Sequence, residues 1–190
     1  MVRTDAQKLA RKARRRRNRI ASLVLFTVAC VGLAWFFESQ ATTTLIFVRH
    51  ADKAATPVDD PSLSVAGQRR AEALASVLAD VDVVASVDAI YTTQYRRTAD
   101  TARPLAALVD VDMGVFDPSD LEFAVNQIVA NHKGEIVLVV GHSNTIAPMI
   151  AELGGSKKLP KIRESEYDNL YVVTIPWFGK VKTLRLRYGE

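Results

Sequence analysis

Four side chains that suit an anion site each follow an apolar, strand-like segment: Arg49, His50, Arg97 and His142. His50 and Arg97 are 47 residues apart, and Arg97 and His142 are 45 residues apart. A guanidinium presents a planar fork of donors that fits the oxygens of a phosphate group. Two imidazoles in the same pocket would supply either a nucleophile and a hydrogen-bond donor or a pair of metal ligands.

A metal centre is the weaker of these two interpretations. The sequence offers no clear third or fourth ligand except Asp52. Two arginines in the same pocket would also repel a metal cation. The residue types therefore favour phosphoryl chemistry, with no metal site.

The hydrophobic pattern predicts the elements that position these side chains. Apolar runs predict strands at 45–48, 87–91, 115–116, 136–140, 170–175 and 181–187. Capping residues and apolar periodicity predict helices at 65–79, 97–109, from 119 or 120 to 131, and from just after 144 to about 153.

This alternation of strands and helices is typical of an α/β fold. We expect a single three-layer domain with a mostly parallel sheet flanked by helices, preceded by an N-terminal transmembrane helix. Ligands of such sheets bind at the carboxyl ends of the strands. The four candidate side chains follow three such ends, so we expect them to lie together.

Composition divides the chain into three parts: a basic leader at 1–19, an apolar segment at 20–37 and a domain at 44–190. The apolar segment has no charged residue and is long enough to cross a bilayer. Basic residues in front of it favour a cytoplasmic N-terminus, which predicts a single-pass membrane protein with its domain on the exported, periplasmic or extracellular side. Small residues at Ser39 and Ala41 leave signal cleavage open, although the long leader favours an uncleaved anchor.

Charge and cysteine content exclude further classes. The leader holds nine of the 25 basic residues, so positions 20–190 carry 16 basic and 20 acidic residues, a net charge of −4. A nucleic-acid-binding domain would carry basic surface, so nucleic acid is not an expected partner. The single cysteine, Cys30, lies in the apolar segment, so the domain holds no disulfide.

Three motifs in this order resemble the histidine phosphatase superfamily, the phosphoglycerate-mutase-like group, and its small single-domain branch in particular. FVRHAD at 47–52 resembles the opening arginine–histidine signature, and VVGHSN at 139–144 resembles the motif of the second histidine. TTQYRRTADT at 92–101 is similar to the second motif, with Thr93 leading, Arg97 as the arginine and Thr101 closing it. LSVAGQRRAEAL at 63–74 is similar to the first helix of the family.

The resemblance implies a phosphoric monoester hydrolase that needs no cofactor. In that mechanism neutral His50 attacks phosphorus, Arg49, Arg97 and His142 surround the transferring group, and water hydrolyses the phosphohistidine. The residues expected to bind substrate are Arg49, Arg97, His142, Ser143 and Asn144. His132, at a helix end, is expected to be a surface or capping residue.

The proton donor is the least certain part of the resemblance. The sequence lacks the glutamate segment of the mutases, and Ser143 stands where the acid phosphatases have an aspartate. Asp117 is the preferred candidate, with Asp120 and Asp52 as alternatives. A site without a dedicated acid would suit good leaving groups such as phosphohistidine.

Several partners and functions stay open on the sequence. The substrate is expected to be a small phosphorylated compound or a phosphoprotein, and the N-terminal helix is expected to bind the membrane. A phosphohistidine protein phosphatase, a mutase and a non-catalytic phosphate-binding module are the alternatives to a monoester phosphatase. Export argues against the mutase, and the two histidines argue against the binding module.

Overall fold

The computed structural model describes residues 5–39, 42–80 and 86–189. The chain divides into two compact units, Met1–Gln40 and Ala41–Glu190. The first unit contains one helix, and the second contains the whole sheet.

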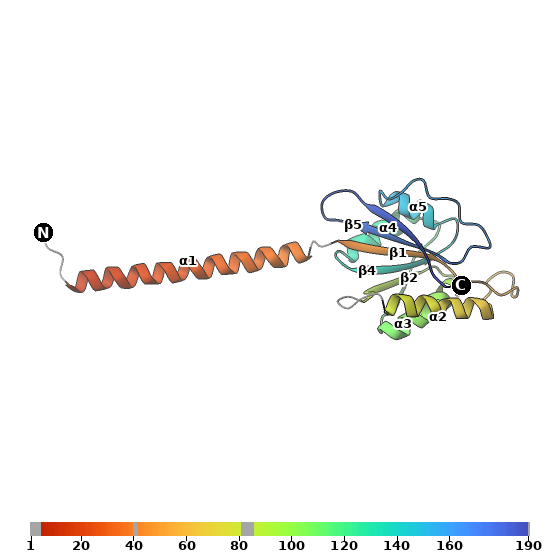
Figure 1. Cartoon of the computed structure of the whole chain (residues 1–190), viewed down its shortest axis with the longest axis horizontal. Coiled ribbons are helices and arrows are strands. Elements are labelled where there is room, and N and C mark those ends of the chain that lie inside the picture. Colours follow the sequence, from red (N-terminus) through yellow and green to blue (C-terminus); the bar gives the residue numbers. More distant parts are fainter. Residues whose placement is uncertain (1–4, 40–41, 81–85, 190) are drawn as a thin grey trace. The chain divides into compact units, whose positions relative to one another are not determined.

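Helix α1 (Asp5–Ser39) forms the first unit (Figure 1). Its segment Lys12–Phe37 contains an 18-residue window with a mean hydropathy of 2.3, and no part of that window is buried in the protein. Within the described ranges it is the one helix with the length and apolarity to cross a membrane, a property that signal sequences share. The predicted apolar run 20–37 lies inside this segment.

A six-stranded sheet forms the centre of the second unit, with the strand order β3-β2-β4-β1-β5-β6. The strands are β1 (Thr43–Arg49), β2 (Ala89–Thr92), β3 (Met113–Val115), β4 (Ile136–Gly141), β5 (Asn169–Ile175) and β6 (Lys182–Arg187). Strands β3, β2, β4 and β1 are parallel to one another, whereas β5 and β6 pair antiparallel. The predicted mixed architecture with a mainly parallel sheet is confirmed.

Helices cover both faces of this sheet. They are α2 (Val65–Ala79), α3 (Arg96–Val109), α4 (Leu121–Asn131) and α5 (Ile146–Glu152). Figure 1 shows α2 and α3 below the sheet and α4 and α5 above it. Alternate residues of β1 point to opposite faces of the sheet. Phe47 therefore packs in the core between the sheet and helices α4 and α5, and Val48 packs in the core between the sheet and helices α2 and α3.

Local capping explains where two of the helices begin. The Ser64 side chain accepts a hydrogen bond from the Gly67 N–H at the start of α2, and Asp120 does the same for Phe123 at the start of α4. His132 is the C-cap residue of α4, as predicted. Helix α3 continues through Pro104.

Candidate active site

The two central parallel strands bring the two predicted histidines together. Arg49 at the end of β1 pairs with Gly141 at the end of β4, and the His50 N–H donates to the Gly141 carbonyl at 2.9 Å. His142 follows Gly141 directly, so the two imidazole centroids lie 5.4 Å apart at 63°. Only 5% of His50 and 9% of His142 is exposed. The pairing of β1 with β4 therefore places the two imidazoles side by side at the centre of the site.

The ring of His50 is fixed by the backbone beside it. Its Nδ1 lies 2.9 Å from the Ala51 carbonyl oxygen, which can only accept, so Nδ1 carries the hydrogen. The Nε2 of a neutral ring then holds a lone pair. The Ala51 N–H donates to Thr101 Oγ1 at 2.9 Å, and the Thr101 hydroxyl donates to the Arg97 carbonyl at 2.7 Å. Thr101 thus links the support of His50 to α3.

A chain of hydroxyls orients His142 in the same way. Thr98 Oγ1 donates to the carbonyls of Tyr95 and Thr93, at 2.7 and 3.1 Å. Its one hydrogen is thereby used, so it accepts from Thr93 Oγ1 at 3.0 Å. Thr93 Oγ1 must then accept from His142 Nε2, which lies 3.0 Å away. These contacts place the hydrogen of neutral His142 on Nε2.

Burial keeps both imidazoles neutral. It lowers the pKa of His50 to about 3; the hydrogen bond to Ala51 opposes this change, and the positive charge of Arg49 adds to it. Burial lowers the pKa of His142 to about 4, with further contributions from Arg97 and Arg49. A neutral imidazole is the form that can act as a nucleophile.

Arg49 is held beneath the site by a distant loop. Its Nη1 donates to the carbonyl oxygens of Arg163, Glu164 and Glu166 at 2.8, 2.9 and 3.0 Å. The guanidinium also lies over the Tyr167 ring, with Cζ 4.2 Å from the centroid. Arg49 Nε is buried and has no hydrogen-bond partner in the structure. A buried charged donor without a partner suits a site for an anion.

Arg97 approaches the site from the start of α3, just after the turn that follows β2. Its side chain is 16% exposed, and its Cζ lies 4.3 Å from the centroid of the Tyr95 ring. Its Nη1 lies 3.9 Å from Oδ1 of Asp60, an atom that also accepts the Arg96 N–H at 3.0 Å. Arg96 itself is exposed.

Two tyrosines complete a paired arrangement that sequence reasoning did not resolve. Tyr167 stacks on Arg49 and its ring centroid lies 6.0 Å from that of His50. Tyr95 stacks on Arg97 and meets His142 edge-on at 5.3 Å. Nothing in the sequence indicated aromatic contacts with both arginines.

A cavity of about 460 Å³ opens beside these residues. It is lined by His50, Gln94, Tyr95, Arg97, Asp117, Pro118, Ser119, His142, Ser143, Asn144 and Thr145. Six of the seven predicted site residues therefore share one cavity. Arg49 does not line it, because its guanidinium lies against Tyr167 and the loop at 163–166.

The carboxyl of Asp117 lies along this cavity but is held ionised. Its Oδ1 accepts both the backbone N–H and the hydroxyl of Ser119, at 2.8 and 2.7 Å. These hydrogen bonds lower the pKa of Asp117. A proton donor needs the opposite shift. The position of Asp117 thus agrees with the sequence-based prediction, whereas its ionisation does not favour the role of an acid.

The two alternative acids are engaged elsewhere. Asp52 accepts from Arg70 Nε at 2.7 Å and forms an ion pair with α2. Asp120 caps α4. Neither belongs to the cavity lining.

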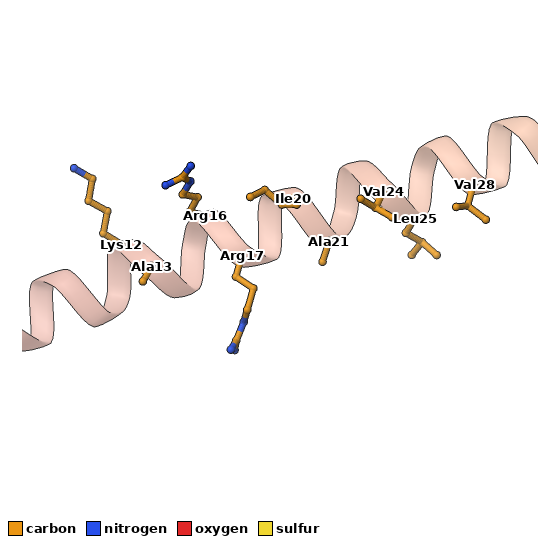
Figure 2. Close-up of a pocket in the computed structure, with 9 residues that line it drawn as sticks. All are labelled: Lys12, Ala13, Arg16, Arg17, Ile20, Ala21, Val24, Leu25 and Val28. Atoms are coloured by element: carbon orange, nitrogen blue, oxygen red, sulfur yellow. The ribbon is translucent and has the colours of Figure 1, made fainter.

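Elsewhere in the described part of the chain, a hollow on α1 lacks the features of a ligand site. Figure 2 shows a hollow whose nine lining residues all belong to α1, so it is the open face of a single helix. No cluster of three or more His, Cys, Asp or Glu side chains among the described residues is placed to hold a metal ion.

Comparison with known families agrees with this geometry. The family model of the histidine phosphatase superfamily (branch 1) matches residues 45–117, which include Arg49, His50 and Arg97. This match supports the resemblance to the histidine phosphatase superfamily that the sequence motifs predicted. No curated protein sequence matches the chain significantly.

Several solved structures with this fold match the chain over nearly the whole length of their own chains. A protein histidine phosphatase SixA in complex with tungstate has 17% identity and a TM-score of 0.64, over 76% of this chain and 96% of that one. A mycobacterial glucosyl-3-phosphoglycerate phosphatase has 16% identity and a TM-score of 0.58, over 77% and 98%. A putative phosphohistidine phosphatase SixA from Agrobacterium tumefaciens has 22% identity and a TM-score of 0.58, over 77% and 97%. At these identities the likeness concerns the fold.

Proposed function

We propose that this histidine phosphatase is a membrane-anchored enzyme that hydrolyses phosphate monoesters through a phosphohistidine on His50. The observation that carries the proposal is the His50 ring, which is neutral, donates through Nδ1 to Ala51 and has its Nε2 lone pair free beside the cavity. A lone pair held in a fixed direction is what an in-line attack on phosphorus needs.

The side chains around this ring, two guanidiniums and a neutral imidazole, suit the transferring phosphoryl group. Arg97 and His142 line the cavity, and Arg49 has an unpaired buried Nε–H. Donors fixed before the reaction stabilise charge on the equatorial oxygens without reorganising. Ser143 and Asn144 line the same cavity and complete the set proposed to bind substrate. A SixA structure with the same fold contains tungstate, an oxyanion like phosphate, which supports an oxyanion as the ligand of this chain.

The reaction balances without a cofactor. Nε2 of His50 forms a bond to phosphorus as the ester P–O bond breaks, and the leaving oxygen takes a proton. Water then attacks the phosphohistidine, the P–N bond breaks, and inorganic phosphate leaves as neutral His50 is restored. Asp117 stays a candidate for the first proton because of its position alone.

A phosphohistidine protein phosphatase is the second candidate, and the state of Asp117 favours it. Among the described residues that line the cavity, Asp117 has the only carboxyl, and hydrogen bonds lower its pKa. A site that has no ready proton donor is best matched to a leaving group that needs little help, and imidazole is a better leaving group than an alkoxide. The two SixA structures with this fold are a protein histidine phosphatase and a putative phosphohistidine phosphatase, which supports the same class.

The deciding experiment compares His50→Ala with His132→Ala in the full chain in detergent. An aryl phosphate, an alkyl phosphate and a phosphohistidine peptide are assayed with and without a chelator. We expect His50→Ala to lose all turnover and His132→Ala to keep it, because His132 contacts Tyr91 and Glu135 outside the cavity. Activity that a chelator removes, or that survives in His50→Ala, would contradict the mechanism.

The same assay separates the alternatives. Turnover of the alkyl ester at a rate near that of the aryl ester supports a general monoesterase with a working acid. Turnover confined to the aryl ester and the phosphohistidine peptide supports the second candidate. Phosphate binding without turnover in the unmodified chain would identify a binding module.

We also propose that α1 stays attached and that the enzyme domain lies on the exported side of the membrane. Helix α1 is long and apolar enough to cross a bilayer, and its basic residues precede the apolar run. A reporter fused to the C-terminus, active only outside the cytoplasm, tests the side. An N-terminus that begins after Ala41 in the mature protein would show cleavage instead.

A further inference from the structure

The turn between β5 and β6 exposes two large aromatic side chains. Trp177 is 61% exposed and Phe178 is 89% exposed. Gly179 follows with φ +114°, a conformation that a side chain would strain, so the turn depends on this glycine to present its neighbours. We call residues 176–180 the aromatic tip. Adjacent exposed aromatics on a soluble surface usually mark a place of contact.

Four lysines lie at the end of the aromatic tip or near the start of β6. Lys180 ends the aromatic tip and Lys182 begins β6, and both are exposed. The Ser156 N–H donates to Thr183 Oγ1 at 3.0 Å, which holds the exposed Lys157 and Lys158 next to the start of β6. None of these four lysines forms an ion pair in the part of the chain that the structure describes.

The register of the sheet places the aromatic tip at a particular end of the domain. Ile175, the last residue of β5, pairs with Thr43, the first residue of β1. Thr43 also lies only four positions after Ser39, the last residue of α1. The chain therefore connects a membrane-spanning α1 to the end of the sheet that carries the aromatic tip.

We infer that the aromatic tip and its lysines bind the surface of a bilayer that contains anionic phospholipids. Tryptophan and phenylalanine side chains prefer the boundary between headgroups and acyl chains, and lysines are attracted to anionic headgroups. The combination of both at one turn matches this partner better than a protein–protein interface, because lysines are depleted in such interfaces. The inference needs α1 in a membrane but does not depend on the proposed reaction.

Binding in this way leaves the candidate active site open. Arg49 ends β1 at the opposite end from Thr43, a separation of roughly 20 Å along a seven-residue strand. The cavity at the carboxyl ends of the strands would thus face away from the lipid. Substrate could enter from the aqueous side while the domain rests on the membrane.

Tryptophan fluorescence in the full chain tests the inference, because the sequence has only two tryptophans. In a Trp35→Phe variant, Trp177 is the sole reporter. The protein is reconstituted into vesicles of phosphatidylcholine alone or with phosphatidylglycerol. We expect Trp177 emission to shift to shorter wavelength and brominated lipid to quench it several-fold more strongly in the anionic vesicles.

Two variants serve as controls. Replacing Trp177 with Ser and the exposed Phe123 with Trp moves the reporter to α4, which begins near the cavity, and lipid quenching should then be lost. Lys180→Gln with Lys182→Gln should weaken the quenching of Trp177, and circular dichroism confirms that the variants are folded. Equal quenching at positions 177 and 123, or none at 177, would overturn the inference. A blue shift that brominated lipid does not quench would show a protein contact and would overturn it too.

Discussion

Thr93 Oγ1 lies 3.0 Å from Nε2 of His142, and both groups are buried. The threonine hydroxyl accepts the imidazole hydrogen because its own hydrogen goes to Thr98. This contact connects the turn after β2 with the turn after β4, so it sets the direction of the His142 ring.

Replacing Thr93 with Val should therefore remove the acceptor and leave a buried N–H without a partner. We expect a loss of about 1–3 kcal/mol in the free energy of unfolding and a lower kcat. Thr93→Ser keeps the hydroxyl and should retain most of both. Urea unfolding and steady-state kinetics measure the two effects. If Val and Ser behave alike, the hydroxyl does not orient His142.

Asp60 should weaken the binding of an anion to Arg97, because its carboxylate lies 3.9 Å from the guanidinium. Asp60→Asn keeps an oxygen for the Arg96 N–H and removes the charge. An exposed ion pair is worth about 0.2–1 kcal/mol, so we expect KM and the inhibition constant of inorganic phosphate to fall by a factor of about two to five at most. The value of kcat should change less.

Asp60→Ala serves as the comparison, because it removes both the charge and the acceptor at the start of α3. It should lower the free energy of unfolding by about 1 kcal/mol, an effect that Asp60→Asn avoids. A rise in KM for Asp60→Asn would instead mean that the carboxylate holds Arg97 in place for the substrate.

The stability of the fold should decrease as the pH falls from about 6.5 towards 4. The pKa of His50 is lowered to about 3 and that of His142 to about 4. In this pH window the unfolded chain takes up protons that the folded chain excludes, so the free energy of unfolding falls by up to about 1.4 kcal/mol per pH unit for each histidine.

A matched variant isolates this contribution from other titrating groups. His142→Gln removes one of the two histidines, so its stability should depend less on pH than that of the unmodified chain. Urea unfolding in phosphate-free buffers between pH 8 and 4.5 provides the comparison. A difference between the two chains that stays constant over this range would show that His142 is not kept neutral by the fold.

Gly67 should be intolerant of a side chain, because a Cβ there would lie 2.1 Å from the Asp52 carbonyl oxygen. The adjacent Ala51 carbonyl accepts the hydrogen bond of His50, so a shift of this backbone disturbs the nucleophile. We expect Gly67→Ala to lose activity and about 1–3 kcal/mol of stability, in spite of the better helix propensity of alanine. The same exchange at Gly32, which has open space around it, should leave both unchanged.

Local sequence features determined the elements and the central chemistry of this protein. The apolar run of β1 and the Ser64 cap of α2 depend on neighbours in the chain, so both could be predicted. The rule that ligands bind at the carboxyl ends of parallel strands then placed Arg97, His50 and His142 in one cavity. Periodicity and capping are short-range properties, which is why a single sequence reveals them.

Only the tertiary structure decided how that cavity is built. Arg49 reaches carbonyls more than a hundred residues away, and Tyr95 and Tyr167 come from separate turns to stack on the two arginines. The ionisation of Asp117 depends on the fold of its own loop. Loops have no periodic pattern, and their contacts form only when distant segments meet. Their charges and hydrogen bonds therefore follow from the packed fold and could not be predicted from the order of residues.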